Sequence, residues 1–211
     1  MSCPLCRQRK PKRFCPAAGE KICPVCCGTY REVTIDCPSD CPHLLAARRY
    51  ETEHRPPLPP DQIPYPETRI SADWIEEHQP LVVLLARTVL DAAKEFHATD
   101  ENVLAALGAL AETYRTLQSG IYYEHAPENA VAREIYVQIA KKISDVQRAQ
   151  AERAGFSSLK DSDLFLLLVF LLRVGKQETS GRPRTRAFLD FLRSSVPAPE
   201  PAGEPSRILT A

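Results

Sequence analysis

Apolar residues recur every three or four positions through most of the chain after residue 70, which is the spacing of amphipathic helices. The predicted helices cover residues 71–79, 80–97, 100–119, 127–154, 161–174 and 183–195. The run from Leu164 to Leu172 is apolar on nearly all sides, so it predicts a central helix that stops at Gly175. No strand-like alternation interrupts this part. We therefore predict an all-α helical bundle.

Two proline-rich stretches border the predicted bundle. Six prolines between Arg55 and Arg69 indicate a semi-rigid extended spacer, and the prolines after Val196 indicate a disordered tail. The expected organisation is therefore a module at residues 1–54, a linker at 55–69, a helical domain at 70–196 and a tail at 197–211. The arginines at positions 182, 184, 186 and 193, in and before the last helix, are expected to be solvated.

The first 54 residues show shorter patterns. Residues 29–36 are rich in β-branched and aromatic side chains and predict a strand, with Lys21 and Ile22 as its hairpin partner and Gly28 near the turn. Pro42 suits the first position of a helix that continues to Tyr50. Cys41 would then lie at a helix N-terminus, where the helix dipole favours a thiolate. The expected fold is a small α+β module with a β-hairpin and a short helix.

All the cysteines of the chain fall within this module. They are Cys3, Cys6, Cys15, Cys23, Cys26, Cys27, Cys37 and Cys41. Two Cys-Pro-x-Cys motifs stand out, because a C-x-x-C turn brings two sulfur atoms to one tetrahedral ion at about 2.3 Å. The proline fixes φ and removes a competing backbone N–H within the turn. This density of thiols predicts a metal-binding module.

The motifs Cys3-Pro-Leu-Cys6 and Cys23-Pro-Val-Cys26 resemble the knuckles of zinc-ribbon and treble-clef modules. The order of the eight cysteines also resembles cross-brace fingers, in which alternating pairs of ligands serve two ions. The resemblance covers residues 3–43 and implies two zinc ions. In the simplest assignment, one ion is held by Cys3, Cys6, Cys23 and Cys26, and the other by Cys15, Cys27, Cys37 and Cys41. An exchange of Cys26 and Cys27 between the ions is left open, and His43 is a possible substitute ligand.

Three other uses of the cysteines compete with zinc, namely disulfides, an iron–sulfur cluster and a thioredoxin-like redox site. The last is the weakest, because no βαβ pattern surrounds either C-x-x-C motif. Disulfides are rare in the cytoplasm, which is the expected compartment because the chain shows neither a secretory leader nor a run long enough to span a membrane. An iron–sulfur cluster also uses four thiolates, and it remains an alternative that would imply a redox protein.

The distribution of charged residues limits the kinds of partner that the chain is expected to bind. The 27 basic and 27 acidic residues cancel, which excludes a polycationic nucleic-acid-binding chain as a whole. A local cluster remains, however, and it consists of Arg7, Arg9, Lys10, Lys12 and Arg13, followed by Phe14. We find no phosphate-binding glycine loop, nucleophile elbow or paired Glu-x-x-His motif in the predicted bundle, so an enzyme is not favoured. The leading hypothesis is a non-catalytic zinc-binding adaptor with a protein partner, and the alternative is nucleic-acid binding through residues 7–14.

Overall fold

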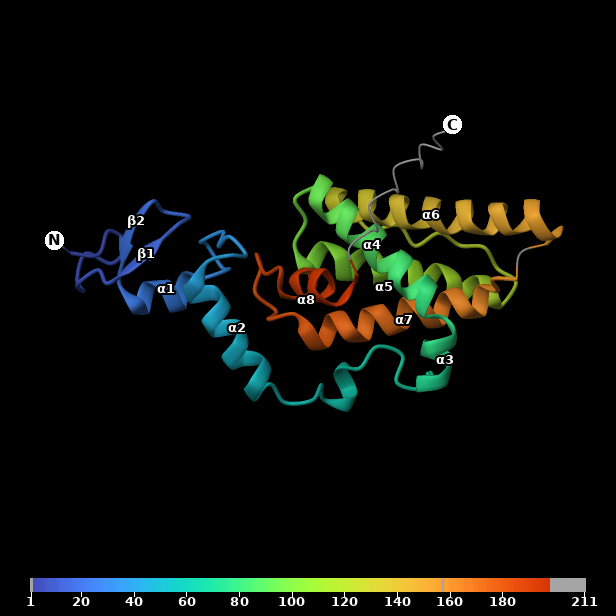
Figure 1. Cartoon of the computed structure of the whole chain (residues 1–211), viewed down its shortest axis with the longest axis horizontal. Helices are drawn as coiled ribbons and strands as arrows, with labels where there is room; N and C mark the ends of the chain where they lie inside the picture. Colours follow the sequence, from blue (N-terminus) through green and yellow to red (C-terminus); the bar gives the residue numbers. More distant parts are fainter. Residues whose placement is uncertain (1, 157, 198–211) are drawn as a thin grey trace, which may run out of the picture.

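A small cysteine-rich module lies at one end of an elongated molecule, and a helical bundle forms the other end (Figure 1). This computed structural model describes residues 2–156 and 158–197. Nearly all of the predicted tail at residues 197–211 lies outside the described residues. The module contains strands β1 (Arg13–Cys15) and β2 (Glu20–Ile22) and helices α1 (Pro24–Tyr30) and α2 (Pro42–His54). The predicted fold class, a small α+β module followed by an all-α domain, is confirmed.

The hairpin of the module uses other residues than those predicted. Strands β1 and β2 pair antiparallel, with Phe14 opposite Lys21 and Cys15 opposite Glu20. Residues 21 and 22 are therefore in a strand as expected, but their partner precedes them in the chain instead of following them. The predicted helix at Pro42 is present as α2, and Cys41 is its N-cap residue.

The predicted strand at residues 29–36 is wrong. Thr29 and Tyr30 complete helix α1, whose start is fixed by the Cys23 sulfur accepting the N–H of Cys26. The chain then turns back, and the Tyr30 carbonyl accepts the N–H groups of residues 33, 34 and 35. Glu32 adopts a left-handed conformation with φ of 55° within this turn. The β-branched residues therefore lie in a tight turn, because the hydrogen bonds of the helix cap and of the turn outweigh the preference of these residues for a strand.

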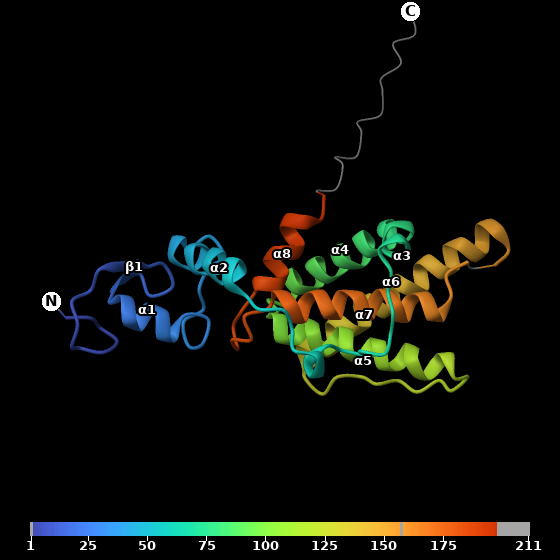
Figure 2. The same ribbon diagram turned by 90° about the horizontal axis from the view of Figure 1, so that it is seen from below.

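Residues 55–70 form an extended arm that lies along the bundle and contains one short 3₁₀ turn, η1 (Pro60–Gln62). Figure 2 shows this arm running from the end of α2 to α3 (Ala72–Glu77). The guanidinium of Arg173 donates to the carbonyls of Pro64 and Thr68, both 2.9 Å away. The Tyr65 hydroxyl donates to Glu112 at 2.6 Å. The arm is therefore bonded to the bundle at several points.

The bundle itself consists of five helices after α3. They are α4 (Gln79–Glu95), α5 (Asp100–Gln118), α6 (Ala130–Ala154), α7 (Asp161–Glu178) and α8 (Ala187–Ser195). Helix α6 begins three residues after the predicted start, because the Asn129 side chain caps it by accepting the N–H of Ala132. Helix α8 begins four residues late, since the residues before it turn against the module, where the Arg184 N–H donates to the Glu32 carbonyl.

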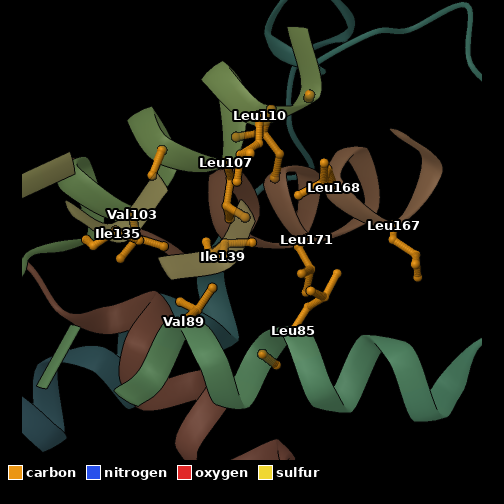
Figure 3. Packing of buried hydrophobic residues seen from close by; sticks show 14 of the residues in the cluster. Leu85, Val89, Val103, Leu107, Leu110, Ile135, Ile139, Leu167, Leu168 and Leu171 are labelled. Carbon is orange, nitrogen blue, oxygen red and sulfur yellow. The ribbon is translucent and has the colours of Figure 1, made fainter. Parts of the chain in front are cut away.

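The core lies where α4, α5, α6 and α7 meet (Figure 3). Leu107 and Leu110 of α5 point toward Leu168 of α7, and all three are fully buried. Helix α7 contributes eight buried residues, as many as α5 and more than α4 or α6, so α7 shares the central position with α5. Burial of side chains of this size contributes about 1.5–3 kcal/mol each to folding.

Helix α7 does not end at Gly175, contrary to the prediction, but continues to Glu178. Gly175 is needed there for close packing. A Cβ atom at this position would lie 2.5 Å from Leu104 Cδ2 and 2.9 Å from Phe188 Cε1. The missing side chain therefore lets α5 and α8 approach α7, a packing role that a sequence pattern does not distinguish from a helix end.

We expect Gly175→Ala to destabilise the bundle by about 1–3 kcal/mol, because the added methyl overpacks the contact with Phe188. Gly108→Ala is the matched control, since Gly108 also lies inside a helix but has no heavy atom within 4 Å of the position that a Cβ would occupy. That control should gain about 0.5–1 kcal/mol from helix propensity. Urea unfolding followed by circular dichroism gives both values. Equal effects of the two substitutions would contradict the packing role.

Candidate metal centre

Four cysteines of the module converge on one point. The sulfur atoms of Cys3, Cys6, Cys23 and Cys26 all lie within 4.8 Å of one another. The Cys6 and Cys23 sulfurs are 3.9 Å apart. A zinc ion at about 2.3 Å from four sulfurs gives a tetrahedron with edges of about 3.8 Å. The spacing of the four thiols therefore fits a single tetrahedral ion, and it places Cys26, not Cys27, in this first group.

Local backbone structure positions these sulfurs. Cys23 precedes α1, so its sulfur accepts the N–H of Cys26 at 3.3 Å, and its own N–H donates to the Cys3 sulfur at the same distance. The first knuckle closes through the Arg7 N–H, which donates to the Cys3 carbonyl at 2.7 Å. Arg7 has a φ of 54°, in the left-handed region. Each knuckle thus directs backbone amides toward sulfur, which stabilises thiolates.

The acidity of the thiols follows from the same arrangement. The backbone N–H groups of Gln8 and Arg9 lower the pKa of Cys6 to about 6. Burial, together with the neighbouring sulfurs of Cys23, Cys6 and Cys3, raises the pKa of Cys26 to about 12. The group therefore ionises easily at its first thiol and resists the accumulation of further negative charge. A divalent cation at its centre would remove that repulsion.

The other four cysteines form a second set around the hairpin and α1. Cys15, Cys27, Cys37 and Cys41 line one small cavity, which His43 also borders. Burial raises the pKa of Cys37, and the charges of Cys41 and Cys15 raise it further. Among the described residues, however, only the first group brings its ligand atoms within 4.8 Å of one another. A second metal centre is therefore not evident from sulfur distances alone. None of the eight cysteines forms a disulfide.

The predicted nucleic-acid-binding residues separate into two sets. Arg7, Arg9, Lys10 and Lys12 are exposed, and Phe14 has 56% of its surface accessible. Arg13 instead points inward, with its guanidinium 3.7 Å from the Cys27 sulfur. The sequence pattern did not single out Lys21, which the strand register places directly across from Phe14. A correctly predicted hairpin would have found it.

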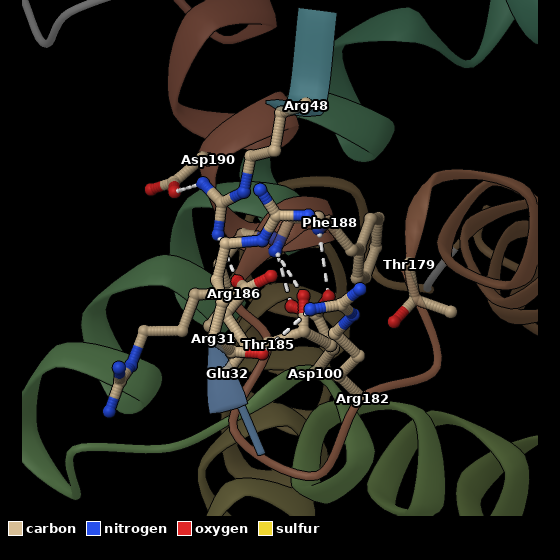
Figure 4. Close-up of polar contacts among 12 residues, drawn as sticks. Arg31, Glu32, Arg48, Asp100, Thr179, Arg182, Thr185, Arg186, Phe188 and Asp190 are labelled. Carbon is tan, nitrogen blue, oxygen red and sulfur yellow. Dashed lines mark hydrogen bonds and ion pairs between the residues drawn. The ribbon is translucent and has the colours of Figure 1, made fainter. Parts of the chain in front are cut away.

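A buried ion-pair network joins the module to the bundle (Figure 4). Glu32, only 2% exposed, accepts from Arg48 of α2 at 2.7 Å. The same guanidinium binds Asp190 of α8. The Glu32 carbonyl also accepts the N–H of Arg184 at 2.8 Å. These residues, which sequence reasoning missed, fix the junction between the cysteine-rich module and the helical domain.

Two arginines expected to be solvated also take part in this junction. Arg182 donates to the Arg31 carbonyl at 2.8 Å, and Arg186 pairs with Asp36 at 2.6 Å. The Arg186 guanidinium holds the pKa of Asp36 below its ordinary value. The turn before α8 is therefore a docking element for the module and not a free charged turn.

A groove of ≈ 820 Å³ lies beside the junction, between the end of α2, the arm and the end of α7. Its walls include Tyr50, His54 and Pro57. The arginines that line it already have partners, since Arg55 pairs with Glu178 at 3.1 Å and Arg182 binds module carbonyls. The cysteine cluster remains the strongest candidate site.

Comparison with protein-family models, with curated proteins and with solved structures finds no match for the chain. None of the helices that the structure describes combines the length and the apolar character needed to cross a bilayer.

Proposed function

We propose that the chain is a non-catalytic adaptor, in which a zinc-stapled recognition module is fixed to a helical scaffold. The first cysteine group carries this proposal, because its four sulfurs lie within 4.8 Å of one another. A site with four protein thiolates has no open position for water or substrate, so its metal contributes folding energy and no catalysis. The role of such a module is to hold a surface rigid.

Zinc is the metal that the donor set favours. Four thiolates in a tetrahedral arrangement select Zn²⁺ or iron. An iron–sulfur cluster places several iron atoms and inorganic sulfides between its thiolates, whereas the four sulfurs here lie within 4.8 Å of one another. The geometry thus favours a single ion, and zinc satisfies four thiolates without redox chemistry.

We also propose that Cys15, Cys27, Cys37 and Cys41 hold a second zinc ion. The support is that these four residues surround one small cavity and that Cys41 begins a helix whose N-terminus favours a thiolate. His43 borders the same cavity and remains the substitute ligand.

The proposed partner of the adaptor is a protein that contacts the knuckle tips. Leu5 and Val25 occupy the same position in the two Cys-Pro-x-Cys motifs, and they are 47% and 51% exposed. Both tips flank the first cysteine group, so the metal would fix their separation. Rigid apolar points of this kind lose little conformational entropy when they are covered by a partner.

Metal content tests the proposal directly. We expect the full chain, purified under reducing conditions, to be colourless and to hold two equivalents of zinc by elemental analysis. Cys41→Ser should lower the content to one equivalent, because a serine hydroxyl is a poor zinc ligand. One equivalent in the unsubstituted chain would refute the second centre alone. No bound metal, or the visible absorption of iron–thiolate, would refute the zinc-stapled module.

A further inference from the structure

The outer face of the β1–β2 hairpin carries one aromatic ring between two lysines. Phe14 is paired across the strands with Lys21, so their side chains share a face. Lys12 lies two residues before Phe14 and continues the same face, and its N–H still donates to the Ile22 carbonyl at 3.0 Å. All three side chains are exposed, whereas Ile22 and Cys15 are buried in the module.

The cations around this face form no ion pair with an acidic residue in the part of the chain that the structure describes. Within residues 2–156 and 158–197, no ion pair involves Lys12, Lys21 or the basic loop of Arg7, Arg9 and Lys10. Two arginines at the junction differ sharply, because Arg31 and Arg48 are each paired with a carboxylate. The structure thus neutralises the positive charge at its internal junction and leaves the hairpin charge available to an external anion.

We propose that this face binds single-stranded nucleic acid, with the ring of Phe14 stacked on a base and the lysines and basic loop on phosphates. Base stacking on an exposed aromatic ring beside backbone-tracking cations is the general chemistry of single-strand recognition. Protein-binding surfaces are depleted of lysine at their centres, yet Lys12 and Lys21 both lie beside Phe14. Strands of three residues also offer no element long enough to fill the major groove of a duplex.

The proposal rests on the metal-folded module proposed above, so the test begins with zinc-loaded full chain. Anisotropy of a labelled single strand of about 12 nucleotides measures binding across a salt series. Contacts to about four phosphates predict a slope of about −3 in a plot of log affinity against log salt concentration. Phe14→Ala should weaken binding about tenfold with little change in slope. Lys12→Gln combined with Lys21→Gln should reduce the steepness of the slope by about 1.4.

Matched substitutions outside the face serve as controls. Phe156→Ala removes another exposed ring, 67% accessible, and Lys141→Gln with Lys142→Gln removes two exposed charges from α6. Neither should alter binding. Zinc content equal to that of the unsubstituted chain shows that each variant keeps the module.

Three outcomes would overturn the nucleic-acid proposal while leaving the zinc module intact. The first is that the zinc-loaded chain does not bind the single strand, and the second is that Phe156→Ala and Phe14→Ala weaken binding equally. The third is that poly-glutamate binds as tightly as the single strand and that Phe14→Ala does not change its affinity. The last would assign the face to an acidic protein partner. If the unsubstituted chain neither takes up zinc nor binds the single strand, the metal-folded module itself is refuted.

Discussion

Cys23→Ser is expected to unfold the cysteine-rich module while helices α4 to α8 stay folded. The Cys23 sulfur belongs to the first group and also caps α1, so the substitution removes a metal ligand and a helix cap together. In the described part of the module, Ile22 and Leu44 are the only fully buried aliphatic side chains, and Ile35 packs at the edge of the cysteine cluster. Ordering each residue costs about 1–2 kcal/mol, which so small a core cannot offset. Structural zinc supplies an apparent free energy of about 10–16 kcal/mol in zinc-finger peptides, which is the scale that is needed.

Hydrogen exchange read segment by segment measures this effect. Amides of β1, β2 and α1 should lose protection in Cys23→Ser, and those of α5 and α7 should keep it. A strong chelator added to the unsubstituted chain should give the same pattern and should change nothing further in the variant. Ser39→Ala, a substitution between Cys37 and Cys41 that removes no thiol, is the control and should leave protection unchanged. Protected hairpin amides after complete metal removal would contradict the structural role of the metal.

The helical domain is largely predictable because its information is local. Periodic apolar residues along α4, α5 and α7 are enough to predict the helices. The sequence-based predictions fail where the same residue type is common in two different local structures. Gly175 has the residue type that commonly ends a helix, but here it makes room for Phe188, a neighbour that only the tertiary structure supplies. The turn after Tyr30 has β-branched residues that suit a strand equally well.

The candidate site is predictable only in its chemistry. Cysteine spacing indicates the two Cys-Pro-x-Cys knuckles, and the structure brings those four sulfurs together. The junction is not predictable, because Arg48 and Asp190 are 142 positions apart in the chain. A single arginine on a short helix and a single aspartate on another look like ordinary solvated charges. Only the buried Glu32, which shares Arg48 with Asp190, distinguishes them.

Arg48→Met is expected to open the junction between the module and the bundle. The Arg48 side chain is 14% exposed and that of Glu32 only 3%, so the substitution leaves a buried carboxylate without its counter-ion. Loss of one member of a buried ion pair typically costs about 3–5 kcal/mol. If the junction opens, water reaches Glu32 and the carboxylate is no longer buried. The destabilisation caused by Arg48→Met is therefore limited to the free energy that holds the module against the bundle. We therefore expect local opening, with the bundle core still folded.

Arg193→Met provides the matched control, because Arg193 also binds Asp190 but is 60% exposed. That pair should contribute less than about 1 kcal/mol. The double variant Arg48→Met with Glu32→Gln should recover part of the loss, since no uncompensated charge remains buried. Exchange of the amides in residues 31–36 and 182–186 reports the opening, and urea unfolding reports the stability of the bundle. If Arg48→Met behaves like Arg193→Met in both measurements, the pair with Glu32 does not hold the junction. The hydrogen bonds that the Arg182 guanidinium and the Arg184 N–H donate to module carbonyls must then be sufficient to hold it.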